Sequence, residues 1–412
     1  MSNKVIKTFV LFSLFVIFLT PVESIIAPAN DDWQVSTPEE QDISSDLLNT
    51  MYSNLKQKHS DKIHNLVITK NADIIFEKYY LTNGSHQWYS CTKTVMGILT
   101  GIAVDQGYIP SIDQKVMAYF PVNNTANFDE RKGNITIKHL LMMRSGFEWG
   151  EWTKPYSDPS NVIYPWQESA NWTKYAINRP MARIPGTAFD YDTGGSHILS
   201  AIIQSASGMA TLDFAETYLF NPLGIEVDDW LKSNEGLVWG GVGLKISPRD
   251  MLKIGDLILN NGTRGGEQIV SEDWIRELAY TPKEVDYIPG TLEVFTSSFW
   301  THYGYQTWIS PSHFGTYVIS ARGFQGQFLT ILPEYRISLV MNAELDREKA
   351  RSVISAILSD YILPAVTASS QTLSISDEIS TNTTTATLPL KIWIFIVPFS
   401  LVIIRHRKRN RN

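Results

Sequence analysis

The chain is organised around the stretch Trp88-Tyr89-Ser90-Cys91-Thr92-Lys93, which continues into residues 94–103 (TVMGILTGIA). Its apolar residues recur at i, i+3, i+4 and i+7, the spacing of one face of an α-helix. These residues are Val95, Ile98, Leu99 and Ile102. Gly107 follows where a helix commonly ends. The stretch therefore predicts a helix that begins near Ser90 and ends before Gly107.

Ser90 and Lys93 are three residues apart, so their side chains are neighbours on a helix. A serine hydroxyl becomes a good nucleophile when a base takes its proton, and a lysine can be that base when its pKa is lowered by burial or nearby positive charge. The N–H groups at the helix N-terminus can also stabilise an oxyanion. The S-x-x-K pattern alone is weak, because it also fits a helix with a surface lysine.

The composition predicts a mostly globular chain. Of 412 residues, 43% are hydrophobic and 19% are charged, and the formal net charge is −7. The body has no long basic stretch, so no nucleic-acid partner is expected. Cys91 is the only cysteine, which excludes an internal disulfide. Its place beside Ser90 favours a small packing residue over a nucleophile.

Both ends of the chain predict targeting segments. Residues 1–24 carry Lys4 and Lys7 before an apolar run and predict a cleaved secretory signal peptide, with an uncleaved anchor as the alternative. After the domain at 25–365, residues 366–388 form a Ser/Thr-rich stalk, 389–404 a transmembrane segment and 405–412 a basic cytoplasmic tail. Because this span is short and contains Pro398, a processed sorting signal remains an alternative. A lipid anchor fits the basic tail less well.

These ends predict a protein on the cell surface, anchored by one C-terminal helix, with its body outside the membrane. Glycosylation sequons agree with that compartment. They begin at Asn83, Asn123, Asn134, Asn171, Asn261 and Asn382.

The predicted elements place strands at both ends of the domain and helices between them. A helix over 43–58 precedes a hairpin formed by 66–68 and 74–76, and further helices are expected at 135–143, 197–205 and 250–259. Later strands are expected at 303–309, 317–321, 328–332 and 337–341, before a helix over 347–362 that Pro364 closes. This order predicts one antiparallel sheet built from the N- and C-terminal segments and flanked by helices. A mainly helical lobe is inserted, with a site in the cleft between the lobes.

Several segments resemble the serine hydrolases related to class C β-lactamases, in that family's order and at suitable separations. They are Tyr89 to Asp113, Ile135 to Gly146, Pro185 to Tyr191, Ser247 to Gly262 and the terminal strands up to Glu334. The resemblance covers roughly residues 35–365 and implies an α/β (α+β) fold of the β-lactamase/transpeptidase type. It also implies that Ser90 is the acylated nucleophile, that Lys93 is the base or part of it, and that Tyr191 relays a proton.

The chain departs from this family where the substrate would be held. The family's second motif is Tyr-x-Asn, whereas Tyr191-Asp192-Thr193 stands here, so Thr193 replaces the amide that would bind a substrate carbonyl. The third motif is Lys-Thr-Gly or His-x-Gly. Its best match is Ala321-Arg322-Gly323 on a sheet-edge strand, in a register that can slip by several residues.

The resemblance assigns substrate-binding roles to this third segment. Arg322 either restores a positive charge near a substrate carboxylate or is a solvated edge residue. The N–H groups of Ser90 and of Gly323 or Phe324 would form the oxyanion hole. The end of the segment, Gly323 to Gln327, is similar to the corresponding strand end of the 6-aminohexanoate-dimer hydrolase type.

We therefore predict a serine hydrolase that cleaves an ester or amide bond of a small molecule through an acyl-Ser90 intermediate. A cell-envelope D-Ala-D-Ala peptidase or β-lactamase is one alternative, and a non-catalytic surface binding module on the same fold is another. The histidines lack metal-ligand spacing, so neither a metal nor a cofactor is predicted. The aromatic run from Phe147 to Trp166 either lines a hydrophobic acyl site or packs the helical lobe.

Overall fold

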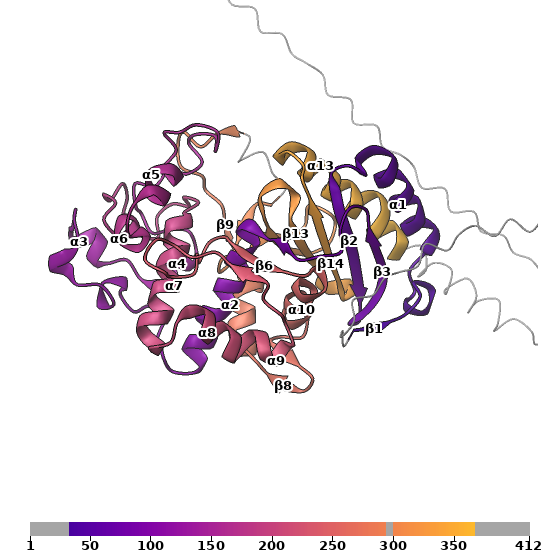
Figure 1. Cartoon of the computed structure of the whole chain (residues 1–412), viewed down its shortest axis with the longest axis horizontal. Coiled ribbons are helices and arrows are strands. Elements are labelled where there is room, and N and C mark those ends of the chain that lie inside the picture. Colours follow the sequence, from indigo (N-terminus) through magenta and orange to yellow (C-terminus); the bar gives the residue numbers. More distant parts are fainter. Residues whose placement is uncertain (1–32, 294–299, 367–412) are drawn as a thin grey trace, which may run out of the picture. The chain divides into compact units, whose positions relative to one another are not determined.

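Strands from both ends of the chain lie side by side in one nine-stranded sheet (Figure 1). The computed structural model describes residues 33–293 and 300–366. The strand order is β1-β3-β2-β14-β13-β12-β11-β10-β9. In that order the strands span Gln34–Val35, Asp73–Tyr79, Ile63–Lys70, Ile337–Ala343, Phe328–Leu332, Val318–Arg322, Trp308–Ser310, His302–Tyr303 and Lys283–Glu284. Because β2 pairs with β14, the sheet is complete only when the two ends of the domain meet.

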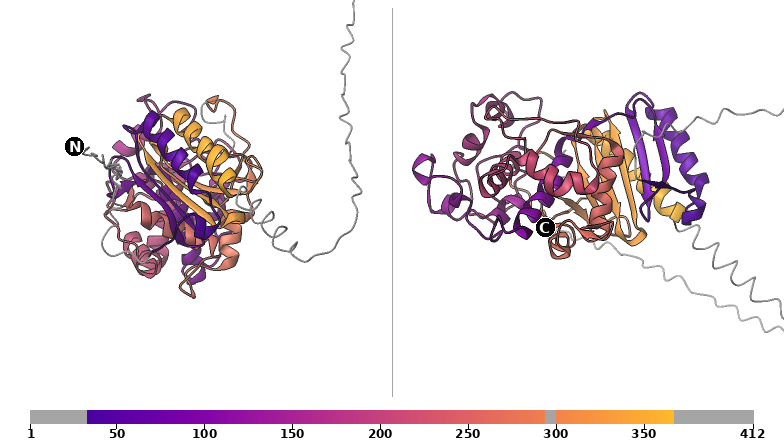
Figure 2. Two further views of the ribbon diagram at one scale, coloured as in Figure 1. Left: turned by 90° about the vertical axis from the view of Figure 1, so that its right-hand side faces the viewer. Right: turned by 60° about the horizontal axis from the view of Figure 1, so that its bottom comes forward.

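Alternating side chains of the central strands bury two layers of helices. Leu339 and Met341 of β14 belong to a core with α1 (Ser45–His59), α13 (Arg347–Ala356) and the π-turn η9 (Ile357–Ile362). Val340, between them, belongs to a second core with α2 (Thr92–Asp105) and α10 (Pro248–Leu259). Successive strand residues point to opposite faces, so one strand supplies both cores. Figure 2 shows α1 and the C-terminal helix together over one face of the sheet.

The segment between α2 and α10 is the mainly helical lobe. Its helical elements are η3 (Val116–Ala118), η4 (Val122–Asn124), α3 (Glu130–Gly133), α4 (Ile137–Leu141), α5 (Ile163–Glu168), α6 (Trp172–Ile177), α7 (Thr193–Ser207), α8 (Thr211–Ala215), η5 (Glu216–Phe220) and α9 (Asn221–Leu223). A small sheet of β4 (His86–Gln87), β6 (Leu244–Ile246) and β5 (Asp229–Trp230) joins this lobe to the approach to Ser90.

The remaining elements are short. They are η1 (Glu39–Gln41), β7 (Thr263–Arg264), β8 (Glu267–Gln268), α11 (Glu272–Ile275), η6 (Arg276–Tyr280), η7 (Phe324–Gly326) and η8 (Pro333–Tyr335). The predicted fold class, with a sheet from both ends and an inserted helical lobe, is confirmed.

The segment 303–309, which we expected as one strand, is instead a hairpin. β10 ends at Tyr303 and β11 begins at Trp308. Between them, the side-chain amide of Gln306 donates to Leu140 O at 2.9 Å, and its carbonyl oxygen accepts from the Ser196 hydroxyl at 2.7 Å. These buried contacts with the helical lobe stabilise the chain reversal between β10 and β11. The local pattern of apolar and polar residues does not indicate them.

Two smaller predictions are also wrong. The sheet is mixed rather than antiparallel throughout, because β1 pairs with β3 in parallel. Pro364 does not end the final helix, since residues 363–366 remain helical. The π-turn η9 just before it already interrupts the regular i→i−4 ladder, which reduces the cost of a residue without an N–H.

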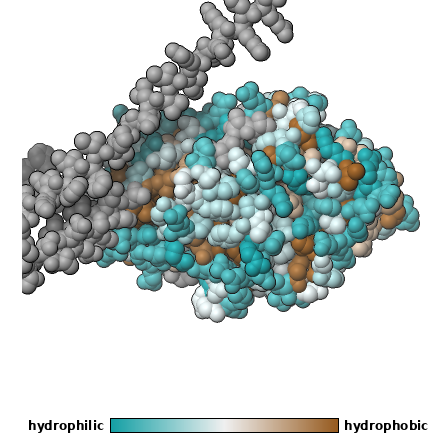
Figure 3. Space-filling view, turned by 180° about the vertical axis from the view of Figure 1, so that it is seen from behind, coloured by the Kyte–Doolittle hydropathy of each residue, from teal (hydrophilic) through white to brown (hydrophobic). Residues whose placement is uncertain are grey.

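The predicted signal peptide, transmembrane segment and basic tail lie outside the described residues, as does the stalk apart from Val366. Within the described ranges, no single helix is long and apolar enough to cross a membrane. One pair bent by 81°, Thr193–Ser207 with Thr211–Leu223, passes by length and composition. The face shown in Figure 3 is mainly hydrophilic, with apolar residues in small separate patches, as on ordinary protein surfaces.

Candidate active site

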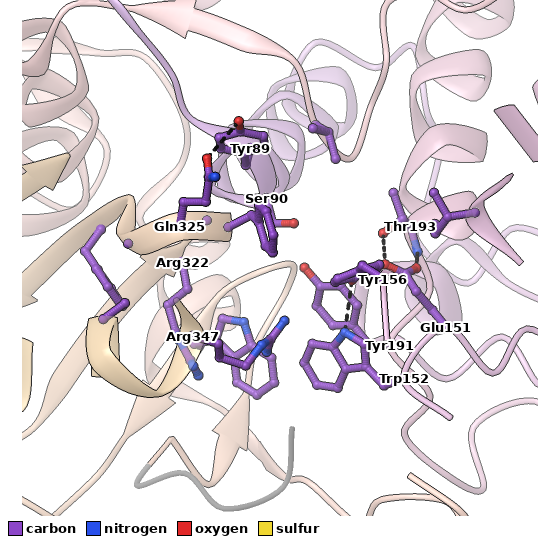
Figure 4. A pocket seen from close by; sticks show the side chains of 18 of the residues that line it. Tyr89, Ser90, Glu151, Trp152, Tyr156, Tyr191, Thr193, Arg322, Gln325 and Arg347 are labelled. Atoms are coloured by element: carbon purple, nitrogen blue, oxygen red, sulfur yellow. Dashed lines mark hydrogen bonds between the residues drawn. The ribbon is translucent and has the colours of Figure 1, made fainter. Parts of the chain in front are cut away.

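Ser90 lies in a short 3₁₀ turn, η2 (Tyr89–Cys91), that leads into α2. Trp88 anchors this turn, because its N–H donates to Leu244 O at 2.9 Å and its indole N–H to Ile246 O at 3.0 Å. Tyr89 has a φ of 47°, a left-handed conformation that is uncommon for residues other than glycine. The anchored turn places Ser90 on the wall of a pocket (Figure 4).

α2 is buried on every side, whereas its spacing predicted one buried face. All residues from Thr92 to Ala103 are buried. Gly97 permits the close packing, since a Cβ there would lie 2.7 Å from Tyr305 O. Lys93 is only 1% exposed, which excludes a surface lysine. Cys91 is also buried, and burial raises the pKa of its thiol, so it behaves as a packing residue.

The Lys93 amine lies beside the Ser90 hydroxyl. Lys93 Nζ is 3.3 Å from Ser90 Oγ and donates to Gly241 O at 2.8 Å. Burial lowers the pKa of Lys93 to about 8, although the negative charges of Glu151 and Asp192 oppose this shift. A base with this pKa is unprotonated in about a tenth of the molecules at pH 7.

Tyr191 lies between an aromatic stack and the lysine. Its ring stacks on Trp152, with centroids 4.1 Å apart and planes 8° apart, and Lys93 Nζ lies 4.8 Å from the ring centroid. Burial and the charge of Glu151 raise the pKa of Tyr191, while a hydrogen bond with Ser90 acts in the opposite direction. The phenol is therefore a proton donor at neutral pH.

Thr193, the first residue of α7, connects Lys93 to a buried carboxylate. Thr193 Oγ1 lies 3.1 Å from Lys93 Nζ and 2.9 Å from Glu151 Oε1. This carboxylate belongs to Glu151, which is only 2% exposed and was not among the predicted site residues. Its position between Trp149 and Trp152 could have indicated burial, because two tryptophans are not expected in a solvated loop.

The third motif lies at the end of β12, which is an inner strand and not the predicted sheet edge. β11 pairs with β12 only as far as Ser320, so Arg322 extends past that neighbour into the pocket wall. Gly323 comes next, and a Cβ there would meet Trp88 O at 2.4 Å. Glycine thus lets the strand end approach the Ser90 turn.

Two arginines line one side of the pocket (Figure 4). The Arg322 guanidinium faces the ring of Trp308 at 5.0 Å, and Arg347 of α13 faces Trp152 at 5.4 Å. Burial, and then the positive charge of Arg347, lower the pKa of Arg322 to about 9. Arg347 was not among the predicted site residues, because nothing in the local sequence of its helix indicates that it reaches the pocket.

The pocket has a volume of about 270 Å³ and brings the predicted site residues together. Lys93 lies behind its wall, and the other predicted residues line it. These are Ser90, Tyr191, Thr193, Arg322, Gly323 and Phe324. The aromatic run from Phe147 to Trp166 contributes both to the pocket wall and to the packing of the helical lobe. Trp152 and Tyr156 line the pocket, while Phe147, Trp149 and Trp166 pack in the core of the lobe.

Known proteins share this architecture. A curated relative, the 6-aminohexanoate-dimer hydrolase of Paenarthrobacter ureafaciens, is 24% identical over 315 residues, which are 72% of this chain and 77% of the relative. A solved structure of a penicillin-binding protein homologue from Pyrococcus abyssi is 20% identical and covers 78% of this chain and 79% of its own, with a TM-score of 0.58.

The D-amino acid amidase of Ochrobactrum anthropi SV3 is 16% identical and covers 79% of this chain and 99% of its own, with a TM-score of 0.57. At these identities, the similarity to both solved structures shows the fold alone. The Beta-lactamase family model matches residues 65–358, which is more than half of the chain. The chain therefore belongs to the Beta-lactamase family.

Proposed function

We propose that this protein is a serine hydrolase that cleaves an ester or amide bond through a covalent acyl-Ser90 intermediate. One observation carries the proposal: the buried Lys93 amine, with its pKa lowered to about 8, lies 3.3 Å from the hydroxyl of Ser90, a residue of the pocket wall. A base near neutrality beside a serine hydroxyl is the arrangement that activates a serine nucleophile.

In the proposed acylation, the Ser90 O–H proton moves to the unprotonated amine of Lys93. Ser90 Oγ then bonds to the carbonyl carbon, and the carbonyl π electrons move to its oxygen. As the bond to the leaving group breaks, the Tyr191 phenol protonates the departing oxygen or nitrogen and is reprotonated by the Lys93 ammonium. Water then attacks the acyl carbon and gives a proton to the same pair, which returns it to Ser90 as the acid leaves.

The oxyanion would be held by the backbone N–H groups of Ser90 and Phe324. Gly323 is the less suitable second donor, because its N–H already donates to Gln327 O at 2.7 Å. The close approach of Gly323 to Trp88 O supports this assignment, since it brings the end of β12 beside the Ser90 turn.

The substrate would be small and partly apolar. The cavity of about 270 Å³ is at the low end for ligand pockets, and much of its wall is aromatic. Arg322 and Arg347 both line the pocket, which favours a substrate with a carboxylate. This placement also favours a substrate-binding role for Arg322 over that of a solvated edge residue. The absence of the family's third-motif lysine argues against a main role as a β-lactamase or D-Ala-D-Ala peptidase.

A fluorophosphonate probe tests the enzyme class. We expect the probe to label the wild-type protein and not the Ser90→Ala variant. A protein that resists labelling and is indistinguishable from Ser90→Ala would favour the binding-module alternative. A panel of neutral and carboxylate-bearing p-nitrophenyl esters, a chromogenic cephalosporin and a D-Ala-D-Ala peptide would then sort substrates. Dominant turnover of the cephalosporin or the peptide would overturn the preference for simple esters and amides.

We also propose that the protein is exported and held at the cell surface by residues 389–404. The support is the apolar run followed by the basic tail, which fits an outside body. The sequon asparagines that the structure describes are all exposed, as acceptors must be. They are Asn83, Asn123, Asn134, Asn171 and Asn261.

A further inference from the structure

Glu151 is a buried carboxylate that accepts four hydrogen bonds. Its Oε1 accepts from the Tyr156 hydroxyl at 2.6 Å and from Thr193 Oγ1 at 2.9 Å. Its Oε2 accepts from Trp149 Nε1 at 2.8 Å and from the Thr193 N–H at 3.0 Å. An ionised carboxylate only accepts hydrogen bonds, and four donors around its two oxygens match this form.

This carboxylate determines the direction of the next hydrogen bond. The Thr193 hydroxyl has one proton, and Glu151 Oε1 can only accept it. The hydroxyl therefore presents lone pairs to Lys93 Nζ, 3.1 Å away, and the bond between them must be donated by the lysine. Without Glu151, the same hydroxyl could rotate and donate to the amine.

The number of protons on the Lys93 amine then determines where its lone pair points. An unprotonated amine has two N–H groups and one lone pair. One N–H is committed to Gly241 O at 2.8 Å, a backbone carbonyl that can only accept, and the other to Thr193 Oγ1. The remaining neighbour in hydrogen-bonding range is Ser90 Oγ at 3.3 Å, so the lone pair faces the hydroxyl proton that it must take.

We propose that Glu151, acting through Thr193, is a positioning residue that directs the lone pair of the unprotonated Lys93 at the Ser90 hydroxyl. This inference rests on the proposed function. The Thr193–Glu151 pair thus supplies the acceptor for the second N–H of Lys93. After proton transfer the third N–H of the ammonium points back at Ser90 Oγ, so the same frame serves both protonation states.

The charges around Lys93 make the role measurable. The groups that face its amine are Glu151, Asp192 at the beginning of α7, Cys91 in the Ser90 turn and the ring of Tyr191. Glu151 is the largest of the charges that raise the pKa of Lys93 against the effect of burial. Its neutralisation should therefore lower that pKa further and also release the Thr193 hydroxyl.

The test compares Glu151→Gln with Glu148→Gln, an exposed glutamate three residues earlier in the same loop. The readout is the second-order rate of fluorophosphonate labelling of Ser90 against pH. For Glu151→Gln we expect the maximal rate to fall about 10- to 100-fold, a part of what a general base contributes. The acidic limb should move to lower pH, which loss of structure alone would not produce. Glu148→Gln should match the wild type.

Thr193 variants keep the test decisive if Glu151→Gln does not fold. Thr193→Ser keeps the hydroxyl and should label faster than Thr193→Val, which removes it and should be as slow as Glu151→Gln. The double variant Glu151→Gln/Thr193→Val should be no slower than the slower single variant, because both changes break one path. Additive losses, or equal rates for the serine and valine variants, would overturn the inference.

A readout without turnover separates this inference from the proposed function. In a Ser90→Ala background, the ¹³Cε resonance of Lys93 reports its titration directly. We expect the Glu151→Gln change to move that titration to lower pH. An unchanged titration and labelling rate in a folded Glu151→Gln protein would remove the positioning role while leaving acyl-Ser90 chemistry intact. Failure of the wild-type protein to label would instead count against the proposed function.

Discussion

The ring and the hydroxyl of Tyr191 contribute to different properties of the protein. The ring stacks on Trp152 in a buried aromatic cluster, and the hydroxyl is the proposed proton relay. Tyr191→Phe should therefore keep the melting temperature within a few degrees of the wild type, and kcat for a p-nitrophenyl ester should fall by about 10²-fold or more, as expected for a lost general acid–base group. Steady-state kinetics and thermal unfolding check both parts.

Tyr287→Phe is the matched control for that change. The Tyr287 ring also contacts Trp152, with centroids 6.3 Å apart, but the mechanism assigns its hydroxyl no role. Its kcat should remain near the wild-type value. An equal loss in the two variants would show that the aromatic cluster, and not the Tyr191 hydroxyl, determines the rate.

At the scale of elements, the contact between the end of β12 and the Ser90 turn depends on one missing side chain. A Cβ at Gly323 would lie 2.4 Å from Trp88 O and 2.8 Å from the Gln327 Cβ, so Gly323→Ala must separate strand and turn. We expect labelling of Ser90 to slow by about 10²-fold, the usual cost of a displaced oxyanion donor. Competitive activity-based labelling measures this rate.

Gly84→Ala provides the comparison, because its Cβ would meet only Thr82 Oγ1 at an ordinary 3.5 Å. This variant should label like the wild type. Normal labelling of a folded Gly323→Ala protein would mean that the second oxyanion donor comes from another segment.

The N-terminus of α7 has a pH-dependent cap. The Asp192 carboxylate accepts from the Gly195 N–H at 2.7 Å and from the Ser145 hydroxyl at 2.9 Å, yet burial raises its pKa to about 7. The unfolded chain releases this proton near pH 4, so the folded protein loses stability as pH rises from about 4 to about 7. Asp192→Asn keeps a capping oxygen and removes this loss.

Urea unfolding at pH 5 and pH 8 measures the effect. The free energy of unfolding of Asp192→Asn, relative to the wild type, should rise between these pH values by about 1 kcal/mol or more. Asp129 caps α3, and its pKa is lowered by Arg131, so it titrates below this pH range and Asp129→Asn should show no change between pH 5 and pH 8. If the free energy of unfolding of Asp192→Asn relative to the wild type did not change with pH, Asp192 would not be the pH-dependent cap.

For the whole molecule, β14, α13 and η9 belong to a compact unit that ends at residue 369, where they contribute to the sheet and to the core that contains α1. The apolar run 389–404 and the basic tail lie beyond this domain. We expect the full chain to sediment with membranes and to require detergent for release. A chain that ends at residue 369 should be soluble after export and label equally well at Ser90.

Fractionation followed by probe labelling checks this expectation. Deletion of 405–412 alone should leave the chain in the membrane fraction, since the apolar run remains. A full chain that is found entirely in the soluble fraction would contradict the anchor. A truncated chain that no longer labels would show that the terminal segment contributes to the fold.

Features that depend on neighbours along the chain could be predicted from the residues alone. Ser90 and Lys93 lie three residues apart, so one predicted helix brought the proposed nucleophile and base together. Short apolar runs between turn residues were enough for the hairpin of β2 and β3 and for the strands β12, β13 and β14. The family resemblance added Tyr191, because its motif is also short.

Features that depend on contacts between distant segments required the folded molecule. Thr193 meets Glu151 across 42 residues, and Gln306 meets Ser196 across 110. Such hydrogen bonds form only after the lobe and the sheet have packed and excluded water, so neither periodicity nor spacing records them. The same burial lowers the pKa of Lys93, and it turns a common four-residue pattern into a serine with a base beside it.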